Sequence, residues 1–308
     1  MKKKICVLSG GTGTPKLLWG LKFVFDDFFV IVNTADDVWL SGLKICPDID
    51  SVIYTLSELI DTKKWWGLRD DTFNTNQMLR KLGFDEYMMI GDRDRAIHII
   101  RTSLLKKGLS LTDVTRILAS KFGLKNDVLP MCDEEVFTQI CTPIGPLHFQ
   151  EFWVKYKGQL DVLDIRLIGI NESKLNPYTK NLLLYNCDVV IIGPSNPITS
   201  ITPIISVKNV KKYISDKFVV AISPIIGEKP VSGPAGKFMR VKGFDVSPLG
   251  VIDVYSNFLD ILIVDTSDKK LEGKVNGVNI LSAPILIKNR KDAVMLSIYV
   301  KKIISKYL

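Results

Sequence analysis

The chain has 308 residues, a formal net charge of +8 and 46% apolar residues. Such a globular composition allows a large core to form without disulfide bonds. The lysines are scattered, so the charge favours a solvated basic surface, and attraction of anionic substrates is the alternative. No basic stripe with interleaved aromatic residues is present, which makes a nucleic-acid interface the weaker option.

The sequence also argues against a membrane protein and against a protein stabilised by disulfide bonds. No apolar run reaches 18 residues, so no transmembrane helix is expected. The N-terminal basic residues lead directly into a strand with no signal-peptide stretch. The five cysteines show no CxxC spacing, which disfavours both a disulfide framework and a thiolate zinc site. We therefore expect a cytoplasmic protein with no membrane partner.

The first part of the chain has the pattern of an opening parallel sheet. An apolar run predicts a strand at residues 4–8, followed by a loop, a helix at about 15–22 and a second strand at 28–32. Apolar residues with helical spacing then predict a helix at residues 50–60.

The middle of the chain, approximately residues 65–160, has a different pattern. Ser110 and Asp113 resemble a capping box at the start of a helix that Gly123 closes. Residues 136–141 and 149–154 indicate strands. We expect this segment to form an inserted helical and small β subdomain.

The α/β pattern returns near Val162 and continues to the end of the chain. The expected elements are a helix at 177–185, strands at 188–192, 218–222 and 261–264, and a final helix from about residue 292. Together the elements predict one α/β domain over residues 1–308, with a doubly wound, mostly parallel Rossmann-like sheet that the middle segment interrupts.

Short polar loops follow the apolar, strand-like runs. They are Gly10-Gly11-Thr12-Gly13, Asn33-Thr34-Ala35-Asp36-Asp37, Gly193-Pro194-Ser195-Asn196-Pro197 and Ser223-Pro224. Loops at the carboxyl ends of parallel strands are where α/β proteins bind ligands, so these loops predict one composite site.

The first of these loops has features of a phosphate-binding turn. Its glycines let the backbone approach an anion, and Pro15 suits the first turn of the helix that follows. Neither GxxxxGK[ST] nor GxGxxG is present, so the loop is not a Walker A motif or a dinucleotide fingerprint. A tight turn without ligand is the alternative.

Carboxylates near the glycine loop point to a cation. Asp48 and Asp50 follow the polar stretch 33–37, and Mg²⁺ prefers a few carboxylates with water and phosphate oxygens. A helix cap is the alternative role for Asp48 or Asp50. The prolines around Ser195-Asn196 restrict that loop, which can present polar donors to a phosphate or a base.

A third polar group begins a helix in the middle segment. Asp94, His98 and Arg101 share one face of the helix that starts at Gly91-Asp92. From the spacing alone, an ordinary charged helix start is the favoured interpretation. No nucleophilic triad is recognisable. The residues by themselves therefore predict an α/β protein that handles a nucleotide or phosphate.

At these strings the chain resembles the 2-phospho-L-lactate transferase family of deazaflavin coenzyme (coenzyme F-420) biosynthesis. The resemblance runs almost end to end. The matching strings are Leu8-Ser9-Gly10-Gly11-Thr12-Gly13, Val32-Asn33-Thr34-Ala35-Asp36-Asp37, Pro47-Asp48-Ile49-Asp50, Gly91-Asp92-Arg93-Asp94, Leu129-Pro130-Met131, Phe149-Gln150-Glu151, Pro194-Ser195-Asn196-Pro197, Ser223-Pro224-Ile225-Ile226 and Gly233-Pro234-Ala235.

The resemblance implies a reaction. The family transfers a phospholactyl group, or its phosphoenolpyruvyl counterpart, from a guanosine diphosphate-activated donor to the ribityl hydroxyl of 7,8-didemethyl-8-hydroxy-5-deazariboflavin, and GMP leaves. The family uses Mg²⁺ and is usually a homodimer. The donor and acceptor are small molecules, so no nucleic-acid partner is expected.

The resemblance also implies site residues. Asp50 is the expected catalytic residue, Asp48 and Asp50 are the expected metal ligands, and Asp50, Met89 and Asp92 are expected at the deazaflavin. The residues expected to hold the guanosine diphosphate moiety are Gly10, Gly11, Thr12, Gly13, Thr14, Ser195 and Asn196.

The chain departs from the family pattern at three places. It has Thr14-Pro15 and Ala35 where the family commonly has glycine-containing strings, and Met89 where relatives often have a basic residue. A non-catalytic, nucleotide-binding regulatory relative is therefore the second hypothesis, and Asp48 and Asp50 favour the enzyme over it. An NAD-dependent oxidoreductase is the third, and the absent GxGxxG argues against it.

Overall fold

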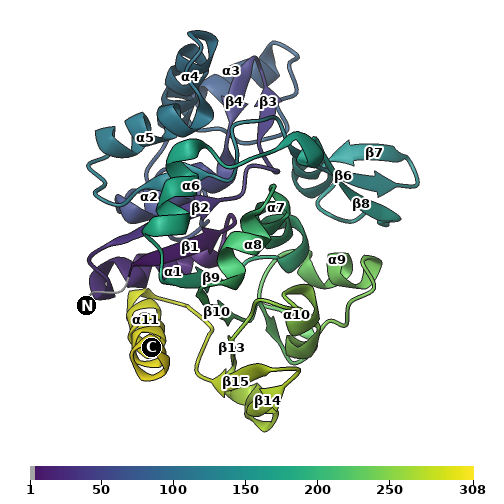
Figure 1. The fold of residues 1–308 in the computed structure, drawn as a ribbon. Helices are drawn as coiled ribbons and strands as arrows, with labels where there is room; N and C mark the ends of the chain where they lie inside the picture. Colours follow the sequence, from purple (N-terminus) through teal and green to yellow (C-terminus); the bar gives the residue numbers. More distant parts are fainter. Residues whose placement is uncertain (1–3) are drawn as a thin grey trace.

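The computed structural model describes residues 4–308 and contains a central sheet of eight strands (Figure 1). The strands follow the order β14-β15-β13-β10-β9-β1-β2-β5. They are β1 (Ile5–Ser9), β2 (Phe28–Val32), β5 (Val128–Pro130), β9 (Val189–Ile192), β10 (Phe218–Ile222), β13 (Ile261–Val264), β14 (Gly273–Val275) and β15 (Val278–Ser282). In this part of the chain no helix is long and apolar enough to cross a membrane.

The order of the strands creates a topological switch point. All neighbouring pairs in the sheet are parallel except β14 with β15. From β1 the chain adds β2 and β5 on one side, and then β9, β10, β13 and β15 on the other. The loops after β1 and β9 therefore diverge to opposite faces, which leaves a crevice at their carboxyl ends. The doubly wound, mostly parallel, Rossmann-like sheet is confirmed.

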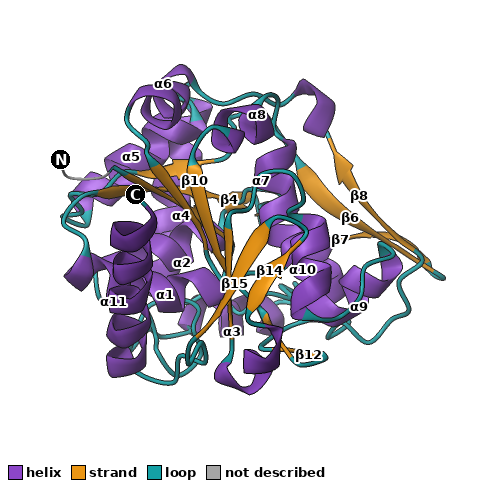
Figure 2. Cartoon of the chain, turned by 60° about the horizontal axis from the view of Figure 1, so that its bottom comes forward, coloured by secondary structure: helices purple, strands orange, loops and turns teal. Residues whose placement is uncertain are grey.

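Both faces of the sheet are buried, as the continuous apolar strands require. In β1, Ile5 and Val7 face one core, and Cys6 and Leu8 face the other. The first core is covered by α1 (Gly13–Val24), α2 (Pro47–Leu56), α5 (Leu111–Lys121) and α11 (Arg290–Tyr307). The second is covered by α6 (Pro177–Tyr185), α7 (Thr202–Ser206), α8 (Val210–Ser215), α9 (Ala235–Val241) and α10 (Pro248–Val254), as Figure 2 shows from below.

Before the middle segment, the hairpin of β3 (Val38–Leu40) and β4 (Leu43–Ile45) leads into α2. The middle segment itself supplies helices and most of a small separate sheet, and its helices α3 (Asn74–Lys81) and α4 (Asp92–Lys106) precede α5. Ser110 caps α5 by accepting a hydrogen bond from the Asp113 backbone N–H, and Gly123 follows the helix with φ of +73°, so both predicted boundaries are confirmed.

The small sheet has the order β7-β6-β8 and projects from the body of the molecule in Figure 1. Its strands are β6 (Phe137–Thr142), β7 (Gly145–His148) and β8 (Asp164–Ile168), and a further hairpin is formed by β11 (Ile225–Ile226) and β12 (Lys229–Pro230). Within residues 65–160, β5 pairs with β2 and so belongs to the central sheet.

Residues 149–154 do not form the strand that the sequence predicted. They contain one turn of π-helix, Glu151–Lys155. Phe149 and Phe152 are both buried and both contact the ring of Phe238 on α9. Aromatic residues three apart share a face only in a helical backbone, so packing on α9 overrides the local strand propensity.

The close packing of α11 on α1 generates a stability prediction. A Cβ atom built on Gly20 would lie 2.2 Å from the Ala293 backbone carbonyl. Gly20→Ala should therefore destabilise the protein by about 1–3 kcal/mol through overpacking, although alanine is the better helix former. Thermal unfolding measures the loss, and Lys302→Ala on the exposed side of α11 is the control, expected to change stability by less than about 0.5 kcal/mol. Equal stability of Gly20→Ala and wild type would contradict the tight helix contact.

Candidate active site

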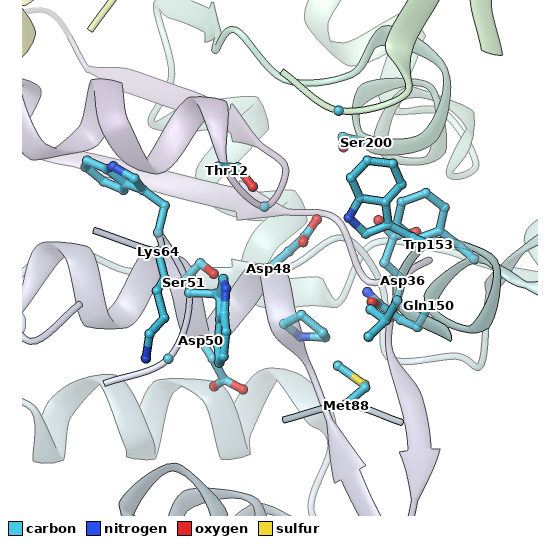
Figure 3. A pocket seen from close by; sticks show the side chains of 18 of the residues that line it. Thr12, Asp36, Asp48, Asp50, Ser51, Lys64, Met88, Gln150, Trp153 and Ser200 are labelled. Atoms are coloured by element: carbon cyan, nitrogen blue, oxygen red, sulfur yellow. The ribbon is translucent and has the colours of Figure 1, made fainter. Parts of the chain in front are cut away.

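A pocket of about 730 Å³ opens at the switch point between β1 and β9. Its walls include the loops after β1, β2, β9 and β10, as the sequence predicted. Figure 3 shows Thr12, Asp36 and Asp48 around this space, with Gln150 and Trp153, which lie before and within the π-helical turn, on one side. The volume is that of a cleft for ligands of drug size or larger.

The glycine loop forms the start of α1 at the pocket wall. Gly11, Thr12 and Gly13 line the pocket, and the N-cap residue Thr12 makes no side-chain capping hydrogen bond to α1. A Cβ atom on Gly13 would collide with the Pro194 carbonyl, so only glycine permits this approach of the two loops. Uncapped N–H groups at a helix start attract an anion.

Ser195 joins the loop after β9 to the glycine loop. Its Oγ accepts hydrogen bonds from the backbone N–H groups of Gly10 and Thr14, each at 3.3 Å, and lies 2.7 Å from Thr14 Oγ1. Gly10 and Thr14 thus support the loop from behind, while Ser195 and Asn196 line the pocket. Asn196 Oδ1 accepts hydrogen bonds from the Ile198 and Thr199 backbone N–H groups, which fixes the side chain at the wall.

Two buried carboxylates face the glycine loop. Asp48 Oδ2 accepts a hydrogen bond of 3.0 Å from Asn33 Nδ2, and Asp48 Oδ1 would lie 2.4 Å from a Cβ atom on Gly11. Asp36 Oδ1 is buried and has no hydrogen-bond partner among the described residues. Burial raises the pKa of Asp48 to about 7, and burial together with the charge of Asp48 raises the pKa of Asp36.

Asp50 is held differently from Asp48, although both are in the first turn of α2. Arg101 on α4 is fully buried, and its guanidinium donates to both carboxylate oxygens of Asp50, with a distance of 3.0 Å from Nη1 to Oδ2. Burial disfavours the guanidinium charge, but the Asp50 carboxylate outweighs burial and raises the pKa of Arg101. Asp50 still lines the pocket.

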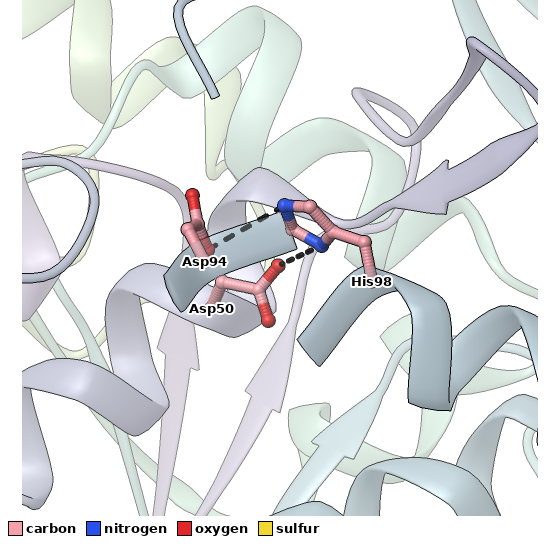
Figure 4. A group of neighbouring side chains, drawn as sticks. All are labelled: Asp50, Asp94 and His98. Atoms are coloured by element: carbon pink, nitrogen blue, oxygen red, sulfur yellow. Dashed lines mark ion pairs between the residues drawn. The ribbon is translucent and has the colours of Figure 1, made fainter. Parts of the chain in front are cut away.

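His98 connects Asp50 to a second carboxylate on the pocket wall. His98 Nδ1 lies 3.6 Å from Asp50 Oδ2, and His98 Nε2 lies 3.4 Å from Asp94 Oδ1 (Figure 4). The Tyr54 hydroxyl donates a 2.6 Å hydrogen bond to the same Asp94 oxygen. Ligand atoms of Asp50, Asp94 and His98 lie within 4.8 Å of one another, but the adjacent Arg101 charge opposes a cation there.

The two further residues expected at the acceptor have different positions. Met89 lines the pocket and its side chain is 47% exposed. Asp92 is absent from the pocket wall. Its carboxylate accepts hydrogen bonds from the backbone N–H groups of Asn74 and Thr75 and from the Thr72 hydroxyl, which lower its pKa. Asp92 therefore anchors the start of α3.

Several residues that line the pocket were not identified from the sequence. Lys64, Trp65 and Trp66 lie on one side of the pocket, and Gln150 and Trp153 lie on another. Three of the five tryptophans of the chain thus line the pocket. The adjacent Trp65-Trp66 was the available signal, because two neighbouring indole rings outside an apolar run are unusual in a surface loop.

Comparison with known proteins places the chain in a family. The family model described as 2-phospho-L-lactate transferase CofD matches residues 5–283. A 2-phospho-L-lactate transferase of Methanococcoides burtonii is 49% identical over 97% of this chain and 98% of its own length. The enzyme of the same name from Methanocaldococcus jannaschii is 44% identical over 95% of this chain and 96% of its own length.

A solved structure shows a similar fold at much lower identity. The crystal structure of a UPF0052 family protein from Bacillus halodurans superposes with a TM-score of 0.64 and 16% identity, and covers 98% of this chain and 99% of that one. This similarity concerns the fold alone. The family model and the relatives carry the assignment, and the chain belongs to the 2-phospho-L-lactate transferase family, a family of enzymes.

Proposed function

We propose that this enzyme transfers a phospholactyl group, or its phosphoenolpyruvyl counterpart, from a guanosine diphosphate-activated donor to 7,8-didemethyl-8-hydroxy-5-deazariboflavin in coenzyme F-420 biosynthesis. The acceptor hydroxyl oxygen forms a bond to the phosphorus that carries the three-carbon acid. The bond from this phosphorus to GMP breaks, and GMP leaves. The main structural support is that an anion-binding loop and a fixed carboxylate, Asp50, share one pocket.

The glycine loop is suited to the diphosphate of the donor. The N-cap residue Thr12 makes no capping hydrogen bond to the start of α1, and Ser195 Oγ holds the loop in place by accepting hydrogen bonds from the Gly10 and Thr14 N–H groups. Fixed donors aimed at the phosphates stabilise negative charge that grows on the leaving GMP. Asn196, next to Ser195, is the proposed contact to the nucleotide from the β9 side.

Magnesium fits the carboxylates opposite the glycine loop. Asp36 Oδ1 has no hydrogen-bond partner among the described residues. The negative charge of the buried Asp48 also raises the pKa of Asp36, so a nearby cation would stabilise the ionised pair. Both carboxylates line the pocket, and Asp50 is the next one along α2. We propose that Asp48 and Asp36 hold Mg²⁺ beside Asp50, where the ion would offset the charge of the donor phosphates when bound.

Asp50 is the proposed catalytic residue. Arg101 keeps its carboxylate in one orientation at the pocket wall, and the pair is buried away from solvent. In this position Asp50 orients the acceptor hydroxyl and takes its proton as the oxygen attacks. Met89 lies on the same wall and contacts the deazaflavin in this proposal, with Asp92 supporting the segment behind it. The homodimer stays a prediction, which sedimentation equilibrium tests.

A turnover assay tests the proposed reaction itself. With Mg²⁺, the deazariboflavin acceptor and either guanylylated donor, the wild-type protein should release GMP and form the phosphorylated deazaflavin in equal amounts. Asp50→Asn should lower kcat about 10²–10⁴-fold, because the amide cannot take the proton. Chromatography of both products measures the turnover.

Asp70→Asn is the matched control, because it makes the same change in an exposed carboxylate outside the pocket. It should retain wild-type turnover. If the wild type binds GDP but releases no GMP with either donor, the non-catalytic regulatory relative becomes the better description of this chain.

A further prediction follows from the raised pKa values of two buried carboxylates, of which Asp48 lines the pocket. Asp37 and Asp48 have a pKa of about 7 in the folded protein, where burial is the main cause, against about 4 in an unfolded chain. The folded state therefore binds more protons than the unfolded state between these values. Without metal, stability should fall as pH rises from about 4 to 7, by on the order of 1 kcal/mol per pH unit for each carboxylate, and the decline should end above about pH 8.

Saturating Mg²⁺ should remove the part of this decline that Asp48 contributes, because the metal replaces the proton on that carboxylate, and should leave the part that Asp37 contributes. Thermal unfolding in chelator and in Mg²⁺ at several pH values provides the comparison. Asp48→Asn should flatten the pH dependence in chelator and weaken the Mg²⁺ effect. A decline that Mg²⁺ leaves unchanged would remove Asp36 and Asp48 as the metal ligands.

A further inference from the structure

Four polar side chains, Arg101, His98, Asp94 and Tyr54, form a continuous polar chain behind Asp50. Arg101 Nη1 lies 3.0 Å from Asp50 Oδ2 and 3.0 Å from His98 Nδ1. His98 Nε2 faces Asp94 Oδ1 at 3.4 Å, and Tyr54 donates to Asp94. The side chains of Arg101, Tyr54, His98 and Asp50 are all more than nine-tenths buried.

The donors and acceptors fix the state of the imidazole. A guanidinium only donates hydrogen bonds, so His98 Nδ1 must accept from Arg101 and carries no proton. The distance of 3.6 Å from Nδ1 to Asp50 Oδ2 is also too long for a direct hydrogen bond. The proton of the neutral ring is therefore on Nε2, where it faces the Asp94 carboxylate (Figure 4).

We propose that His98 is a positioning residue for the transfer reaction, in which its Nδ1 lone pair holds the Arg101 guanidinium in the orientation that fixes Asp50 at the pocket wall. The proposal rests on the proposed function, because it gives Asp50 a reaction to serve. Asp94 and Tyr54 complete the chain by holding the ring from its Nε2 side.

The arrangement explains why a histidine occupies this place. A carboxylate can accept hydrogen bonds from different pairs of guanidinium nitrogens. With Asp50 as the only partner, the Arg101 guanidinium could therefore adopt more than one orientation. The Lys44 backbone carbonyl also accepts from Nη1, at the longer distance of 3.4 Å, and the closer acceptor at His98 Nδ1, at 3.0 Å, removes most of that freedom. The polar chain thus links Asp50, deep in the wall, to Asp94, which lines the pocket in its own right.

Two substitutions distinguish the roles of the two ring nitrogens of His98. In His98→Asn the side-chain oxygen replaces the Nδ1 acceptor, and in His98→Gln the amide replaces only the Nε2 donor. We expect kcat to stay within about threefold of wild type in His98→Asn and to fall about tenfold to a hundredfold in His98→Gln and His98→Leu, with KM changed little.

A merely structural role predicts a different order. Glutamine favours a helix interior more than asparagine does, so packing and propensity alone would make His98→Gln the milder change. Thermal unfolding and GDP binding of each variant exclude misfolding as the cause of lost turnover. Equal kcat in the Asn and Gln variants, or a higher kcat in His98→Gln, overturns the positioning role.

Nitrogen-15 NMR of labelled histidine tests the geometry without turnover. The chain has only two histidines, so His148→Gln assigns the His98 signals. The expected signature is a neutral ring protonated at Nε2, and Arg101→Lys should shift the Nδ1 resonance. A proton on Nδ1 overturns the proposal whatever the kinetics. Absence of turnover in the wild type overturns the proposed function and the role in transfer with it, and the NMR result then decides the hydrogen-bond chain alone.

Discussion

The burial of several carboxylates at and behind one pocket wall is the constraint on which this site depends. Asp36, Asp37, Asp48 and Asp50 are each at least nine-tenths buried, and they lie on the short segment from the end of β2 to the first turn of α2. Ionised carboxylates away from water are costly unless a cation or hydrogen-bond donors compensate them. The Arg101 guanidinium pairs with the Asp50 carboxylate. The positive charge of Lys44 lowers the pKa of Asp37 and so partly offsets the effect of burial on that carboxylate. Asp36 and Asp48 have no such cation among the described residues, which is the physical basis of the metal proposal.

The middle segment supplies what the parallel sheet lacks. Arg101 and His98 belong to α4, and α4 also accepts a hydrogen bond from the Lys44 backbone N–H at Thr102 Oγ1. The glycine loop proposed to bind the donor phosphates comes from β1 and α1, at the switch point of the sheet. Arg101, which holds the Asp50 carboxylate, comes from α4 outside the sheet. In the proposed function, the sheet therefore supplies the phosphate-binding loop, and α4 supplies the residue that fixes Asp50.

The sequence predicted the sheet and its ligand-binding edge because both have local signals. Apolar runs followed by polar, glycine- or proline-rich loops marked β2, β10 and β13 with correct bounds. The Asp50–Arg101 pair has no local signal, because 51 residues separate its members and only the packing of α4 near α2 brings them together. For the same reason helical spacing favoured an ordinary role for His98. The strand predicted at residues 149–154 was wrong for the opposite reason. Local propensity favoured a strand there, but contacts with Phe238 stabilise a helical backbone.

The side chain at position 14 links the two loops of the switch point. Thr14 Oγ1 lies 2.7 Å from Ser195 Oγ. The threonine side chain needs space on the β9 side, where a Cβ atom on Gly193 would lie 2.1 Å from Thr14 Oγ1. Glycine at position 193 therefore makes room for the hydroxyl, and the hydroxyl adds a side-chain contact to the two backbone hydrogen bonds that Ser195 already accepts. Thr14 thus joins the loops after β1 and β9 from behind, because it does not line the pocket.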